Sequence, residues 1–123
     1  MISYSVYKVL HLTGVLMVFL SLGGVAMNAI NTSGASIAWK KPAAITHGIG
    51  LLISLVGGFG LLARLGIMHG GLPGWALAKL CIWILFAGMI GVLLKKPNLA
   101  KPIWFVMIVG GSLAAYLAGY KPF

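Results

Sequence analysis

The sequence contains no aspartate and no glutamate among its 123 residues. Without these side chains the protein has no carboxylate to act as general acid or base, to bind a hard cation, or to relay protons. Any anion that neutralises its nine lysines and arginines must come from lipid phosphate, from the acid groups of a cofactor, or from a partner protein. A proton-coupled transporter is disfavoured, because such proteins usually rely on an intramembrane carboxylate.

Charge of either sign and cysteine are also scarce. Only 7% of the residues are charged, whereas roughly a quarter are in an average soluble domain. Hydrophobic residues make up 61% of the chain and the mean hydropathy is +1.08, so lipid is its main solvent. The basic residues stand at the ends of apolar runs rather than in a patch with aromatics, which argues against nucleic-acid binding. Cys81 is alone and can form neither an internal disulfide nor a c-type haem attachment site.

Four long apolar segments are present, and we expect helices at about 3–29, 42–67, 72–94 and 102–120. Crossing a hydrocarbon layer of ~30 Å takes roughly 20 helical residues. The first segment is too long for the apolar core of a signal peptide, so we interpret it as a mature helix. The breaks between segments are short, which makes sequential helices antiparallel neighbours. The sequence therefore predicts an all-α, integral membrane, up-down four-helix bundle that forms one domain over residues 1–123.

The distribution of positive charge predicts an orientation. The first and third loops lie on one side and hold five lysines: Lys40, Lys41, Lys95, Lys96 and Lys101. The other side holds Lys8, Arg64 and Lys121. Because cytoplasmic loops are enriched in Lys and Arg, we expect both termini outside the cytoplasm, in a bacterial inner membrane.

Small residues recur every four positions along the last predicted helix, in two adjacent lines: Gly110, Ala114 and Ala118, and Gly111, Ala115 and Gly119. Such ridges allow helices to pack closely, or leave room for a flat ligand. One ridge could pack internally while the other meets a second protein. Since a chain with cations and no anions repels itself, we expect a homo-oligomer or a larger membrane complex, with anionic lipids beside the lysine-rich loops.

Three basic residues lie inside the predicted helices and away from their charged ends: His11, His47 and Lys79. Placing an ionisable side chain inside the hydrocarbon layer costs free energy, so each of these residues merits a functional hypothesis. Counting ~1.5 Å per residue, His11 and Lys79 lie roughly 10 Å and 9 Å deep from the same face, and His47 roughly 8 Å deep from the opposite face. His11 and Lys79 can therefore share a pocket, whereas His47 is poorly placed to join them.

The surroundings of His11 suit a porphyrin. Residues on or beside its helical face are Tyr4, Tyr7, Lys8, Gly14, Val15 and Val18, and the third helix carries a matching stripe of Trp75, Lys79, Trp83 and Phe86. Gly14 would let a flat macrocycle approach the backbone, and Lys8 could meet a propionate. Neutral imidazole is a common ligand of haem iron, so His11 is the first candidate, with His69 or His47 as further candidates.

Structural alternatives remain open for each of these residues. His11 could be a core histidine bonded to a neighbouring carbonyl, and Lys79 could extend its amine to the membrane interface. His47 could be structural. His69, in a glycine-rich loop on the His11 side, could be interfacial.

At this point the sequence resembles a known family. Tyr7-Lys8-Val9-Leu10-His11, Trp75-Ala76-Leu77-Ala78-Lys79-Leu80 and the terminal Lys121-Pro122-Phe123 are similar to the HemJ-type protoporphyrinogen oxidases, which belong with the CopD-like and SirB2-like small membrane proteins. In the HemJ-type family a first-helix His and a third-helix Lys are functional, and the bundle holds b-type haem. The resemblance implies these roles for His11 and Lys79.

Three functional hypotheses follow. The first is a haem-b-binding membrane protein with an electron-transfer or redox-accessory role, in which His11, Lys79, Gly14, Lys8, Trp75 and Trp83 form the cofactor site. The second is a cofactor-free accessory subunit that packs in a larger membrane complex. The third is a HemJ-like protoporphyrinogen oxidase. The first two favour a chain that is not an enzyme by itself.

Overall fold

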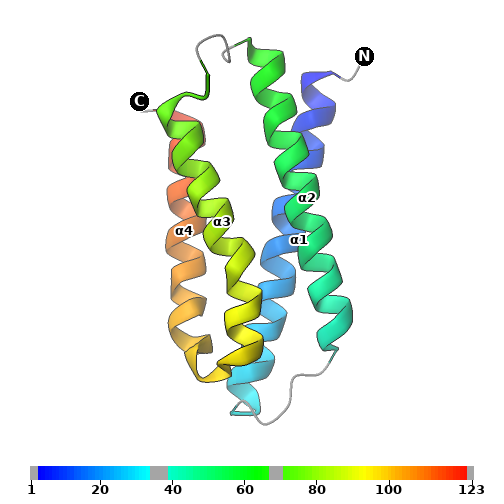
Figure 1. Cartoon of the computed structure of the whole chain (residues 1–123), viewed down its shortest axis with the longest axis vertical. Coiled ribbons are helices and arrows are strands. Elements are labelled where there is room, and N and C mark those ends of the chain that lie inside the picture. The colour runs from blue at the N-terminus through cyan, green and yellow to red at the C-terminus, as the bar shows by residue number, and fades with distance from the viewer. Residues whose placement is uncertain (1–2, 34–38, 67–70, 122–123) are drawn as a thin grey trace.

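The protein forms four long helices in the computed structural model, which describes residues 3–33, 39–66 and 71–121. They are α1 (Tyr4–Asn31), α2 (Lys40–Leu65), α3 (Gly74–Lys95) and α4 (Ala100–Tyr120), with a short 3-10 turn η1 (Pro97–Leu99) before α4. The helices alternate in direction, so both described chain ends lie at one end of the bundle (Figure 1). We call this end the terminal end, and the opposite one, where the first and third loops lie, the loop end.

The helix boundaries lie within two residues of the predicted ones, and the end of α4 at Tyr120 matches; the predicted end of α2 at residue 67 lies outside the described residues. The predicted starts at Pro42 and Pro102 were late, because each proline is the third residue of its helix. Proline is tolerated there, since the first-turn N–H groups have no intrahelical acceptor. Ser3 caps α1 by accepting a hydrogen bond from the Val6 N–H, and Gly66 ends α2 with a φ of 68° that suits glycine.

Each of the four helices is long and apolar enough to cross a membrane. Their outer surfaces are also apolar, with Leu20 75%, Leu16 69% and Val109 66% exposed. A water-soluble bundle would cover these positions with polar side chains. The fold therefore fits an integral membrane protein.

Glycines make α1 and α2 the closest helix pair. A Cβ added at Gly14 would lie 2.4 Å from the Ser54 backbone nitrogen and 2.6 Å from the Gly50 carbonyl oxygen. A Cβ at Gly57 would lie 2.5 Å from the His11 backbone nitrogen, and one at Gly60 would enter the Tyr7 ring. Only glycine permits so close an approach of two helix backbones.

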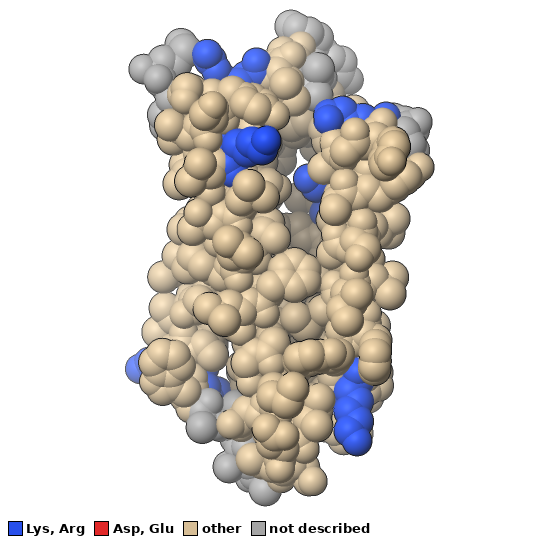
Figure 2. All heavy atoms as spheres, turned by 180° about the vertical axis from the view of Figure 1, so that it is seen from behind, with Lys and Arg blue, Asp and Glu red and all other residues tan. Residues whose placement is uncertain are grey.

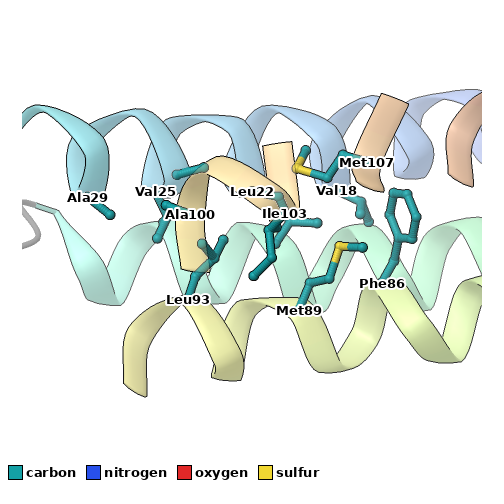
Figure 3. Close-up of a cluster of buried hydrophobic side chains, with 11 residues drawn as sticks. Val18, Leu22, Val25, Ala29, Phe86, Met89, Leu93, Ala100, Ile103 and Met107 are labelled. Atoms are coloured by element: carbon teal, nitrogen blue, oxygen red, sulfur yellow. The ribbon is translucent and has the colours of Figure 1, made fainter. Parts of the chain in front are cut away.

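The main hydrophobic core lies in the loop half of the bundle. Helix α1 contributes Val18, Leu22, Val25, Ala26 and Ala29, α3 contributes Phe86, Met89 and Leu93, and α4 contributes Ala100, Ile103 and Met107. These side chains point toward one another between the helices (Figure 3). Leu22 and Leu93 are fully buried, so this half of the bundle is tightly closed.

Candidate functional site

The terminal half of the bundle is hollow. Two adjoining cavities, of about 470 Å³ and 180 Å³, lie between the α1/α2 pair and the α3/α4 pair. We call them the wide cavity and the narrow cavity, and together the slot. The residues that line both are Tyr4, His11, Ser54, Leu61, Lys79, Trp83 and Ala118. Figure 2 shows a hollow between two columns of the molecule at the terminal end, with Lys or Arg atoms on its walls.

The slot arises from the small residues of α4. In the loop half, α4 places Ile103 and Met107 in the core. In the terminal half α4 buries Leu117 in a second, smaller core with Trp75 and Ala76, but the residues it presents to the wide cavity are small: Gly111, Ala114, Ala115, Ala118 and Gly119. The helices there remain too far apart for these side chains to fill the space. Both predicted ridges thus contribute to the slot, which favours room for a ligand over packing alone.

Two aromatic rings form the floor of the slot. Phe19 of α1 and Phe86 of α3 meet edge to face, with ring centroids 5.1 Å apart and an interplanar angle of 65°. A Cβ added at Gly110 would lie 2.8 Å from the Phe86 ring, and one at Gly111 would lie 2.6 Å from the Phe19 ring. The two glycines therefore seat the rings against α4, and the rings separate the slot from the core.

His11 is held in the slot by α2. Its Nδ1 lies 2.7 Å from the backbone carbonyl oxygen of Ser54. Because a carbonyl oxygen can only accept, Nδ1 carries the proton. In the neutral ring this leaves Nε2 with its lone pair, and the ring lines both cavities. Gly57 and Gly58 leave room for the His11 backbone and ring, respectively.

Lys79 of α3 lines the same two cavities as His11, as the equal depths of the two residues predicted. Its side chain is half-buried and its positive charge acts on His11. The chain has no carboxylate side chain that could pair with it. The slot therefore contains a basic side chain for which no other side chain of the protein can supply a carboxylate partner.

Two further lysines line the slot. Lys8 lines the wide cavity, as predicted for a residue near the headgroups. Lys121 lines the narrow one, where its amine donates a hydrogen bond to the Ala118 carbonyl oxygen at 2.7 Å and lies 5.3 Å from the centroid of the Trp75 ring. With Lys79, these residues make the slot strongly positive.

The two tryptophans predicted beside the cofactor both line the slot. Trp75 is nearly buried and borders the narrow cavity. Trp83 borders both cavities, and its Nε1 donates a hydrogen bond to the Leu51 carbonyl oxygen at 3.0 Å. This bond joins α3 to α2 and fixes the indole plane as part of the wall.

Two residues assigned to the face of His11 turn away from the slot. Gly14 and Tyr7 pack against α2, at Gly50 and Gly60 respectively. The expectation that Gly14 gives a macrocycle access to the backbone is therefore wrong, because the α2 backbone occupies that space. The residues of α1 that line the slot are instead Tyr4, Lys8, His11, Leu12, Val15, Val18 and Phe19.

His47 does not join His11. His47 is 1% exposed, its Nε2 lies 3.0 Å from the Phe86 carbonyl oxygen, and it lines neither cavity. It joins α2 to α3 below the floor of the slot, as the structural alternative had it. His69 lies outside the described residues.

The sequence analysis missed Ser54, whose carbonyl oxygen positions His11. Every residue has a backbone carbonyl, so the sequence does not show which carbonyl oxygen will accept a given hydrogen bond. The usable signal was the cluster of glycines in the second helix, which shows where another helix comes close.

The donor set of the slot is sparse. Across residues 3–33, 39–66 and 71–121 no three His, Cys, Asp or Glu side chains gather where they could hold a metal ion. The slot offers one imidazole nitrogen, three ammonium groups and apolar walls. No family model, curated protein or solved structure matched the chain.

Proposed function

We propose that the chain is a haem-b-binding membrane protein with an electron-transfer or redox-accessory role. The observation that carries this proposal is the hydrogen bond from His11 Nδ1 to the Ser54 carbonyl oxygen. A metal-ligating histidine typically donates its second ring N–H to such an acceptor, which fixes the tautomer and the ring orientation. His11 Nε2 would then be the atom that holds the haem iron.

The residues of the slot fit haem better than a bare metal ion. A metal held by protein alone needs several ligands, and the described residues provide no such group. Haem iron needs only axial ligands from the protein, because the porphyrin supplies the remaining nitrogens. A wide cavity of about 470 Å³ also falls within the range of roughly 300–1,000 Å³ that ligand pockets occupy.

The lysines of the slot complement the acid groups of haem. Lys8, Lys79 and Lys121 lie around a cavity with apolar walls in a chain without carboxylates. A ligand with an apolar body and carboxylates at one edge would neutralise these charges and fill the apolar space. Haem b has this character, and Lys8, Lys79 and Lys121 would be the residues that hold its propionates.

Bound haem would supply one-electron chemistry, while the chain supplies binding, orientation and exclusion of water. Phe19, Phe86 and Trp83 give the slot apolar aromatic walls. A protoporphyrinogen oxidase would also need a proton acceptor. The chain offers no carboxylate for this task, so we favour electron transfer over that activity.

The visible spectrum of the purified protein tests the proposal. Protein produced with haem supplied and purified in mild detergent should show a sharp Soret band, with roughly one haem per chain. A colourless protein under these conditions would contradict haem binding and favour the cofactor-free subunit.

Replacing Lys79 with methionine tests the charge of the slot. Lys79→Met keeps the length of the side chain and removes its charge, so it leaves the bundle stable. We expect haem affinity to fall by about tenfold, because a desolvated carboxylate would lose its charged partner. The matched control is Lys101→Met, at the loop end, which should bind haem normally. Equal haem affinity in both variants would mean that Lys79 does not contact haem and only extends its amine to the membrane interface.

We also propose that the chain sits in a bacterial inner membrane with both termini outside the cytoplasm, in a homo-oligomer or larger complex. The five lysines at the loop end support the orientation. Native mass spectrometry from nanodiscs with mixed lipids should detect an oligomer, a partner chain, or retained anionic lipid. A monomer with none of these would contradict the proposed association.

A further inference from the structure

The wide cavity reaches the outer surface of the bundle between α1 and α4. Its lining includes residues that are exposed on the outside: Lys8 and Leu12 from α1, and Ala115 and Gly119 from α4. In Figure 1 these two helices lie behind α2 and α3, so in Figure 2, seen from behind, they face the reader. The hollow in Figure 2 lies on this face. In a membrane this opening would face the acyl chains of the lipids.

The opposite face of the slot is bulkier. Between α2 and α3 the narrow cavity is bordered by large apolar side chains, among them Phe59, Leu65 and Leu80. On the α1/α4 face the α4 side consists of glycine and alanine. A Cβ added at Gly119 would meet nothing within 4 Å, so the space beside this residue is open. On the α4 edge of this opening a flat or bulky molecule therefore meets only glycine and alanine.

Positive charge accompanies this opening. Lys8 lies one helical turn closer to the terminal end than His11, on the exposed side of the wide cavity, and Lys79 lies within the slot. An amphiphile with acid groups at the headgroup level could contact Lys8 first and Lys79 next, while its apolar body stays in hydrocarbon. Such a path requires no charged group to cross the bilayer interior, which would be costly.

From this geometry we propose that the slot takes up its ligand, an anionic amphiphile dissolved in the bilayer, sideways through a portal between α1 and α4. The portal is the gap bordered by Lys8, Leu12, Ala115 and Gly119. The proposal rests on the proposed haem binding for the identity of the ligand. It adds that the ligand arrives from the lipid phase and not from the aqueous phase at the terminal end.

Blocking the portal tests the proposal. Ferric haem is dissolved in phosphatidylcholine vesicles that contain the haem-free protein, and the growth of the Soret band is followed over time. In Gly119→Trp and Ala115→Trp the indole would occupy the gap and have to move aside first, so we expect uptake at least about tenfold slower. Because both residues also border the wide cavity, final occupancy is measured separately at long times, and the rate is compared for the fraction of protein that loads.

Two matched variants serve as controls. Gly88→Trp makes the same substitution at an exposed helical glycine of α3 that does not line the slot and that also has no atom within 4 Å of an added Cβ. Leu80→Trp enlarges the wall on the α2/α3 face. Gly88→Trp should load at the normal rate, and Leu80→Trp, at a residue that borders the narrow cavity, should slow uptake less than the two portal variants do. Normal rates in the two portal variants, or slowing only in Leu80→Trp, would overturn the portal.

A second measurement separates this proposal from haem binding itself. If the unmodified protein takes up no haem, the proposed function is wrong. The portal is then tested by measuring whether lipid acyl chains reach the slot. Trp83, which lines both cavities, is kept as the sole tryptophan by replacing the other three with Phe, and the protein is placed in lipids brominated on their acyl chains. We expect the bromines to quench Trp83 and Gly119→Leu to reduce this quenching, whereas Gly88→Leu leaves it unchanged. Equal quenching in the two variants, or none at all, would refute an opening to the lipid at this position.

Discussion

His11→Ala should abolish haem binding while the bundle still inserts and folds. Removing a residue that only hydrogen-bonds to a metal ligand lowers metal affinity by about 10–100-fold. Removing the ligand itself should therefore lower haem affinity by at least about 100-fold. The cost in folding free energy should be small, because the lost hydrogen bond to Ser54 contributes about 1 kcal/mol. The haem content of the purified variant and its Soret band, measured beside helicity by circular dichroism, check both expectations.

His47→Ala is the matched control for this experiment. His47 is buried and bonded to the Phe86 carbonyl oxygen, outside the slot. Its loss should leave the Soret band in place and lower the free energy of unfolding by about 2 kcal/mol or more, through the cavity and the lost bond. His11→Ala should therefore lose haem and largely keep its stability, whereas His47→Ala should keep haem and lose stability.

Added imidazole provides a further check on His11. The truncated side chain leaves space beside Gly58, so imidazole should restore a histidine-like Soret band in His11→Ala. A full and unshifted haem spectrum in His11→Ala without imidazole would show that another residue ligates the iron.

Gly14→Ala should give the largest loss of stability among single-methyl substitutions. The added Cβ would lie 2.4 Å from the Ser54 backbone nitrogen, and backbone cannot turn aside as a side chain can. The two helices would have to separate, which should lower the free energy of unfolding by about 3 kcal/mol or more. This is the upper end of the range seen when a group is added to a well-packed site. Because Ser54 holds His11, haem affinity should fall as well. Equilibrium unfolding in mixed sodium dodecyl sulfate micelles, followed by circular dichroism, measures the first effect.

Gly24→Ala in the same helix is the matched control. An added Cβ at Gly24 meets nothing within 4 Å. Alanine favours a helix over glycine by roughly 0.5–1 kcal/mol, so this variant should be neutral or slightly more stable. Equal stability of the Gly14 and Gly24 variants would mean that α1 and α2 do not depend on the close approach of their backbones.

The sequence by itself determined the all-α class, the positions of four membrane-length helices, and the shared depth of His11 and Lys79. These follow from local properties, since hydrophobic length sets the spans and the helical rise sets the depth. The absence of Asp and Glu likewise fixed that no carboxylate side chain of the protein can supply the counter-charge of Lys79. No folding of the chain can alter these features.

Only the tertiary structure decided which way each residue faces. In a helix that is apolar all round, hydrophobic periodicity cannot say which side meets a neighbour and which meets lipid. Thus Gly14 packs on α2 while Val15, next to it in sequence, lines the slot. The tertiary structure also paired His11 with the Ser54 carbonyl and His47 with that of Phe86. Backbone acceptors have the same chemistry at every residue, so only the approach of the helices selects among them.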